Sequence, residues 1–406
     1  MSKADVRYVI GFQSSIDTPV VCSGDIATGV LFSNYPDFTV DNIILDNEYL
    51  RGSSAKHYKL NYRKSVYAYK IPFSIVATPT SLYPILRLFF QRGYHITGDT
   101  IWFYPYSYEL SGSVCSVWGT VVRKLTDSNT DSQRLSGAIT DTLTFDLSDY
   151  FLKVTGNFTA RRLETDYDST NDDFTLDTEG SLLKRQAVSK IGDSYTALQN
   201  FDIESLALNI RNNIKPRYYN NEYIKRYTLG KVTSDGRLRC PRENSSTDYN
   251  DDVFLNYAEE TKVVRICVYW DSLYSPTVSI SFLAKLVDIE QEIAEGNSNT
   301  IVFYAVEDSS FSFFDNKIQE WQVDSSDATI VSLTLATDVV LTGNVFPGDK
   351  ILMKDSTNSI KLYKISDIID DNTIKLSEAH IDGTGAGGEQ AVIIRQPITI
   401  GINKGG

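Results

Sequence analysis

The sequence predicts a mainly β protein with one flanking α-helix at about 81–92 and a small C-terminal β domain. Tyrosine is frequent, with 25 residues, and like threonine, valine and isoleucine it suits a half-buried sheet surface. Apolar and polar residues alternate in many short segments, which is typical of strands. One segment alone has the spacing of an amphipathic helix.

The chain divides into three predicted parts. Residues 1–20 are expected to form an N-terminal arm, because they lack clean periodicity. Residues 21–316 form the main domain, with polar loops at 166–180 and 211–260. Residues 317–406 change to short strands with frequent turn signals, which predicts a small barrel or sandwich appended to the main domain.

The predicted helix has apolar residues at i, i+3, i+4 and i+7, namely Leu82, Ile85, Leu86 and Phe89. Ser81 is the expected N-cap, because Pro84 then falls in the first turn, where its missing N–H has no partner in any case. Gly93 is the expected stop. A single helix among many strands indicates a helix packed on a sheet face.

Sustained alternation predicts a hairpin between 137 and 161 with one buried and one wet face. In its first arm the apolar Leu143, Phe145 and Leu147 alternate with polar residues. The sequence also indicates an internal duplication. The segments around 37–58 and 201–219 each contain a strand with a central asparagine, a polar stretch and then aromatic residues.

Length and charge fit a globular chain of two or three domains. The 406 residues are 42% hydrophobic, enough for a sizeable core. The net charge of -13 repels nucleic acid and anionic membranes on average; it serves solubility, or it lines a channel through which a polyanion slides. The sequence shows neither signal-peptide character nor an apolar run of about 18 residues, so we expect a protein made in the cytoplasm.

The sequence contains no recognisable motif for catalysis or metal binding. The three histidines and four cysteines are far apart and show no ligand spacing. The run from Gly383 to Gly388 precedes a strand rather than a helix, so we interpret it as a linker. The segment from Asp166 starts like a calcium loop, but Asn171 and Asp177 replace its glycine and glutamate, so we expect a mobile acidic loop. We predict no enzyme activity, cofactor or metal.

The basic stretch 211–242 is the candidate interaction site, with a local net charge of +7. Tyrosines lie between its cations, as they do in protein interfaces and in single-strand nucleic-acid sites. In an acidic protein, the acidic surface of the next copy is the obvious partner, so we predict a subunit interface; a solvated face and nucleic-acid binding are the alternatives. The residues are Lys215, Arg217, Tyr218, Tyr219, Tyr223, Lys225 and Arg226.

Several segments share a layout with one known family. An N-terminal segment with Asp17-Thr18-Pro19 precedes strands through 23–26 and 41–43 and the single helix. The paired segments GAITDTLTFDL and FLKVTGNFTAR form a strand with a VTGxF return strand, and NFDIESLALNI at 200–210 is of the same character. Over roughly residues 10–310, the chain resembles the major tail tube proteins of long-tailed bacteriophages.

This resemblance implies a tail-tube-type β-sandwich whose sheets join between copies into an inner barrel. Rings, usually hexamers but trimers where one chain holds two modules, stack into a hollow tube that conducts DNA during ejection. The implied protein is a structural, non-enzymatic component of the virion tail. Its partners are other copies of itself, other tail proteins and DNA that passes without specific binding, with no membrane. The alternatives are another β-rich virion or adhesion module, such as a capsid, baseplate or glycan-binding protein, and an enzyme.

Overall fold

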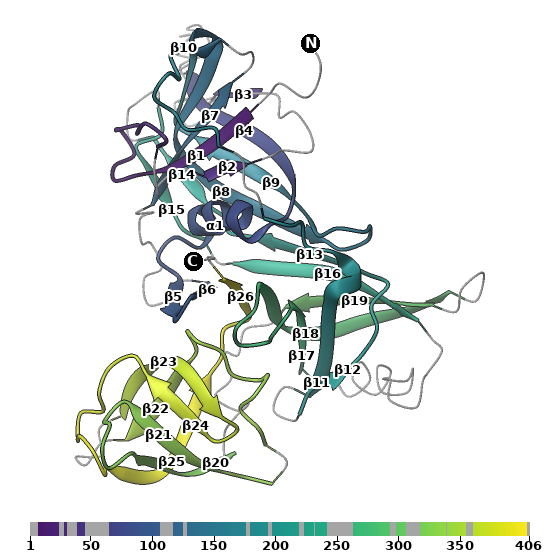
Figure 1. The fold of residues 1–406 in the computed structure, drawn as a ribbon, viewed down its shortest axis with the longest axis vertical. Helices are drawn as coiled ribbons and strands as arrows, with labels where there is room; N and C mark the ends of the chain where they lie inside the picture. Colours follow the sequence, from purple (N-terminus) through teal and green to yellow (C-terminus); the bar gives the residue numbers. More distant parts are fainter. Residues whose placement is uncertain are drawn as a thin grey trace, which may run out of the picture.

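The structure is a computed structural model and is mainly β, which confirms the predicted fold class (Figure 1). An 18-stranded sheet system and a closed six-stranded barrel form its two parts, and one α-helix occurs in the described residues. The described residues are 7–23, 28–30, 39–44, 65–105, 117–124, 128–175, 179–193, 197–218, 223–230, 232–241, 263–292, 298–305, 317–337, 339–354 and 360–403.

The N-terminal half of the sheet system forms a first module, unit 1. Its pairings are β1–β2, β1–β7, β7–β8, β8–β10, β8–β9, β9–β4 and β4–β3. The long strand β8 pairs with β7 and β10 through its N-terminal half and with β9 through its C-terminal half. The strands are β1 (Arg7–Gln13), β2 (Thr28–Val30), β3 (Thr39–Ile44), β4 (Ser65–Val76), β7 (Trp118–Lys124), β8 (Ser132–Asp146), β9 (Lys153–Ala160) and β10 (Arg162–Tyr167).

A second module, unit 2, repeats all seven pairings. Its strands β11, β12, β13, β16, β17, β18, β19 and β26 correspond in this order to β1, β2, β3, β4, β7, β8, β9 and β10. Their bounds are β11 (Ala187–Asp193), β12 (Gln199–Asn200), β13 (Ser205–Arg211), β16 (Thr233–Pro241), β17 (Val263–Trp270), β18 (Val278–Glu292), β19 (Ser298–Ala305) and β26 (Ile398–Asn403). The segments around 37–58 and 201–219 contain the corresponding strands β3 and β13.

The two units also share a β-bulge at the same position. Strands β8 and β18 are both 15 residues long. Each shifts its register against the following strand, between Thr140 and Thr142 in β8 and between Leu286 and Asp288 in β18. The partner just before each shift is a phenylalanine, Phe158 or Phe303, so the correspondence extends to individual residues.

The helix α1 (Pro79–Phe90) begins two residues before its predicted start. Thr78 is the N-cap: its side chain accepts the N–H of Ser81, and the Ser81 hydroxyl accepts the N–H of Thr78. This reciprocal cap, with Pro79 in the first turn, compensates for the hydrogen bond that Pro84 cannot make. The helix packs its buried leucines and phenylalanines into the main core.

The predicted arm is wrong for residues 7–13. They form β1, which pairs on both sides, with Tyr8, Val9 and Ile10 buried. These three consecutive apolar residues were the signal of a buried strand. Arg161 contacts Asp17 just beyond this strand.

The predicted exposed loop at 166–180 is wrong for residues 166–175. Tyr167 and Ser169 are buried. The Asp172 carboxylate accepts the N–H of Cys22 at 2.7 Å, and the Cys22 carbonyl accepts the N–H of Asp173 at 2.7 Å. The acidic segment is held against the chain that follows β1, because it satisfies the backbone N–H and C=O of Cys22. Residues 176–178 lie outside the described residues.

The barrel is inserted in unit 2 rather than appended to the chain. Its strands are β20 (Ile318–Val323), β21 (Ile330–Leu335), β22 (Lys350–Lys354), β23 (Ile360–Asp370), β24 (Thr373–Leu376) and β25 (Gly387–Ile394). The final strand β26 leaves the barrel and pairs with β18 and β6. The predicted domain 317–406 is therefore wrong at its C-terminal end, because β26 completes unit 2.

Smaller elements complete the fold. A hairpin of β5 (Tyr94–Thr97) and β6 (Thr100–Phe103) follows α1, and a hairpin of β14 (Lys215–Arg217) and β15 (Arg226–Thr228) follows β13. Two 3-10 turns span Asn129–Asp131 and Lys184–Gln186. The predicted loop at 211–260 is therefore wrong for much of its N-terminal part, where β14, β15 and β16 form, and 242–260 lies outside the described residues.

Buried charged groups join the barrel to unit 2. Arg265 is fully buried in β17 and donates to the Asn344 carbonyl at 2.9 Å and to the Ser281 hydroxyl at 3.2 Å. Nearby, the buried Asp349 carboxylate accepts the N–H groups of Phe346 and Gln396. Burial raises the pKa of Asp349 to about 6, although Arg265, the two N–H donors and Arg395 oppose the shift.

We predict that Asp349 makes stability depend on pH. Its folded pKa lies above the ordinary 3.8, so its stabilising contribution is complete below that value and is lost as pH rises through about 6. Between pH 5 and 7 this group should lower the free energy of unfolding by about 1 kcal/mol. Urea unfolding of dilute protein at both pH values checks this, and Asp349→Asn should remove that part of the slope. An equal slope in the variant would contradict the assignment.

Candidate functional site

The site follows from the joint between the two units. Strand β8 of unit 1 pairs antiparallel with β13 of unit 2, with Thr144 opposite Asn209. On one face of this joint the side chains of Leu143, Leu208 and Ile210 are fully buried. The joint therefore makes one continuous sheet, in the order β3-β4-β9-β8-β13-β16-β19-β18.

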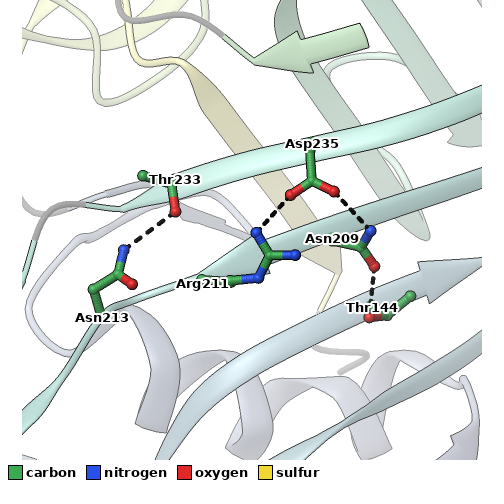
Figure 2. Close-up of polar contacts among 6 residues, drawn as sticks. All are labelled: Thr144, Asn209, Arg211, Asn213, Thr233 and Asp235. Carbon is green, nitrogen blue, oxygen red and sulfur yellow. Dashed lines mark hydrogen bonds and ion pairs between the residues drawn. The ribbon is translucent and has the colours of Figure 1, made fainter. Parts of the chain in front are cut away.

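The other face of the joint is polar (Figure 2). The Thr144 hydroxyl donates to the Asn209 side-chain oxygen at 2.9 Å, and the Asn209 amide donates to Asp235 at 3.0 Å. Arg211 donates to the other oxygen of Asp235 at 2.7 Å. Figure 2 shows this chain of contacts running across β8, β13 and β16.

The charges on this face are mixed and partly paired. The side chains of Arg211 and Asp235 are 51% and 44% exposed, so their ion pair adds less than about 1 kcal/mol. Arg239 pairs with Glu204 at 2.9 Å in the same way. Such pairing lowers the positive potential of Arg211 and Arg239, while Arg237 of β16 is exposed on the same face.

The candidate cations lie together on the β14–β15 hairpin. Lys215, Arg217, Lys225 and Arg226 are all exposed, and Arg217 stands opposite Arg226 in the ladder. Two exposed cations in direct register repel each other unless an anion lies between them. The hairpin therefore gathers the four cations within a short, exposed stretch of chain.

The candidate tyrosines do not share this exposure. Tyr218 and Tyr223 are partly buried, and Arg162 lies over the Tyr223 ring at 4.9 Å. Tyr219 lies outside the described residues. Because stacking of bases needs open ring faces, this arrangement disfavours the single-strand nucleic-acid interpretation.

Sequence reasoning missed the residues that hold the hairpin in place. Tyr227 is fully buried, and its hydroxyl lies 2.9 Å from the Gly137 carbonyl of β8 and 3.2 Å from the Thr159 carbonyl of β9. Ile16, Ile139 and Ile224 pack around it. The apolar Ile224 within a basic stretch was the available signal, since it predicts an anchored rather than a free segment.

The described residues were also searched for possible metal ligands and for membrane-spanning helices. No group of three or more His, Cys, Asp or Glu in them could hold a metal ion. The buried His380 ring lies 4.8 Å from Trp321 and 4.9 Å from Tyr363, in the barrel core. In the same part of the chain, a helix of the length and apolar character needed to cross a membrane is not found.

The fold and this site define a protein of two topologically repeated β units, joined edge to edge and carrying an inserted barrel. Comparison with protein-family models and with curated proteins finds no match to the chain.

We predict that Tyr227 fastens the hairpin to unit 1. Tyr227→Phe keeps the ring but removes the hydroxyl donor, which should lower the free energy of unfolding by about 1 to 2 kcal/mol. Urea unfolding measures this change. Tyr150→Phe is the matched control, because Tyr150 is 84% exposed and the same change there should cost little. Equal effects at the two positions would contradict the anchoring role.

Proposed function

We propose that this protein is a structural subunit that assembles into stacked rings around a hollow channel, the tail tube of a long-tailed bacteriophage. The observation that carries the proposal is the joint between β8 and β13. Through it two units of the same topology already share one sheet within a single chain. A chain built in this way forms part of a ring of such units.

Edge pairing supports association between copies. Unpaired N–H and C=O groups along a strand edge favour pairing with another chain, and closing the sheet removes such edges. Association through two different edges is heterologous, and it yields a ring when the rotation closes. Since each chain holds two units, three chains give the six units of the usual hexameric ring, as the resemblance implies.

The continuous sheet from β3 to β18, called the shared sheet below, has a polar face that suits the wall of a channel. Its arginines at 211 and 239 each have an acidic partner. A polyanion binds by releasing counterions to unpaired positive charge, so compensated arginines favour passage over retention. DNA is thus a transient occupant, while copies of the chain and other tail proteins are the lasting partners.

We predict that purified protein forms rings or tubes as its concentration rises. Negative-stain electron microscopy across a concentration series should show stacked rings with a central stain-filled channel. A chain that stays monomeric at high concentration in sedimentation would contradict the proposal. Binding to sugars on a glycan array by such a monomer would favour the adhesion-module alternative.

We also predict that the cations of the β14–β15 hairpin contact acidic surface of a neighbouring copy. Arg217, Lys225 and Arg226 changed together to glutamate should abolish tubes in micrographs, because attraction becomes repulsion. Circular dichroism and unfolding should show an unchanged fold. The control changes the same charge elsewhere, on the barrel, by replacing Lys354, Lys361 and Lys375 with glutamate. Normal tubes from the hairpin variant would contradict this assignment.

A further inference from the structure

The continuous sheet that runs from β3 to β18 has two edges without a partner strand among the described residues. Strand β3 pairs with β4 on one side only. Residues 286–292 of β18 pair with β19 on one side only, while β17 pairs with Val278 to Lys285 and β26 with Val278 to Phe282. Both edges belong to the shared sheet, at its opposite ends.

The repeat relates these two edges to the joint inside the chain. Strand β18 corresponds to β8, and the common bulge places Glu290 at the position of Thr144. Strand β3 corresponds to β13, and the ladders through β4 and β16 place Thr39 at the position of Asn209. The two open edges are therefore the same two surfaces that meet between units 1 and 2.

We infer that β3 of one copy pairs antiparallel with residues 286–292 of β18 in a second copy, in the register of the β8–β13 joint. Thr39 then stands opposite Glu290, and Val40 stands opposite Ile289. This inference rests on the proposed self-assembly and defines the contact that produces it. The partner is a second copy of this chain.

The bulge supports this pairing. At the joint inside the chain, the bulge residue Asp141 receives two backbone groups of the incoming segment. Its carbonyl accepts the N–H of Asn212 at 2.9 Å, and its carboxylate accepts the N–H of Ile214 at 3.1 Å. The residue in the corresponding bulge of β18 is Val287, an apolar side chain that is 58% exposed in the single chain.

Asparagine recurs at the matching place on the incoming strand. Asn42 in β3 has the position of Asn212, which follows β13. The Asn212 side chain donates to the Phe89 carbonyl of α1. When β3 of a second copy pairs with β18, Asn42 stands next to the backbone carbonyl of the bulge residue Val287. Asn212 stands in the same way next to the carbonyl of Asp141.

The chain itself excludes the other pairing. The edge of β8 that would accept β3 is already paired with β13 of the same chain. A β3 strand from outside can therefore join the shared sheet through β18, and each copy offers one such edge and one such strand. The contact runs head to tail, as ring closure needs.

Cysteine trapping tests the register. The background is Cys115→Ser, so that the native cysteines left are the buried Cys22, Cys240 and Cys267. In it, Thr39→Cys combined with Glu290→Cys should yield disulfide-linked dimers and trimers on mild oxidation, with loss of the monomer band on a non-reducing gel. Directly opposite residues in an antiparallel pair lie within disulfide reach. The positive control is Thr144→Cys with Asn209→Cys, which should close a bridge within one chain.

The wrong-face control is Thr39→Cys with Ile289→Cys. A shift of one residue turns the side chain to the opposite face, so this pair should not link copies. Micrographs of each variant under reducing conditions report assembly independently. Tubes without the Thr39–Glu290 link, or with the wrong-face link, would overturn the register while leaving the proposed function intact. Failure of the unsubstituted protein to assemble would overturn both.

Discussion

The hydrogen-bonding demand of sheet edges is the constraint on which the rest of this structure depends. Each unit presents one edge strand of the β3 type and one of the β8 type. Inside the chain, β13 meets β8, and Asp141 completes the joint by accepting two further N–H groups. The apolar face is closed by this contact, while Thr144, Asn209, Arg211 and Asp235 on the polar face stay at least partly exposed. One interaction thus fixes both the continuity of the sheet and its two-sided character.

The sequence predicted those parts of the fold in which the alternation of apolar and polar residues identifies a strand without knowledge of its partner. The hairpin of β8 and β9 was clear because each strand has one buried and one wet face, and the structure contains it. The bulge gave no such signal, since a single unpaired residue such as Asp141 is visible only against its partner strand. The position of β26 was missed for the same reason, because its pairing with β18 links residues more than 100 positions apart.

For the candidate site, the sequence identified the cations but not their support. Lysines and arginines can be recognised in the sequence by their charge. The burial of Tyr227 depends on backbone carbonyls of β8 and β9, which the local sequence does not reveal. Arg265 shows the converse. It is the single charged residue in the apolar strand β17, and the structure explains it as the donor that reaches the barrel residue Asn344. A charged residue within an apolar strand indicates that its side chain has a polar partner, but the sequence does not show which residue that partner is.

The place of the barrel is compatible with a sheet that continues beyond one chain. In unit 1 a single residue, Arg161, connects β9 to β10. In unit 2 the barrel occupies the same connection, between β19 and β26. Strand β26, which follows the barrel, pairs with Val278 to Phe282 in the N-terminal half of β18. The barrel is therefore connected to the half of β18 that already has a partner strand on both sides. The C-terminal half and β3 keep their open edges, so the insertion adds a second domain without occupying the edges through which units join.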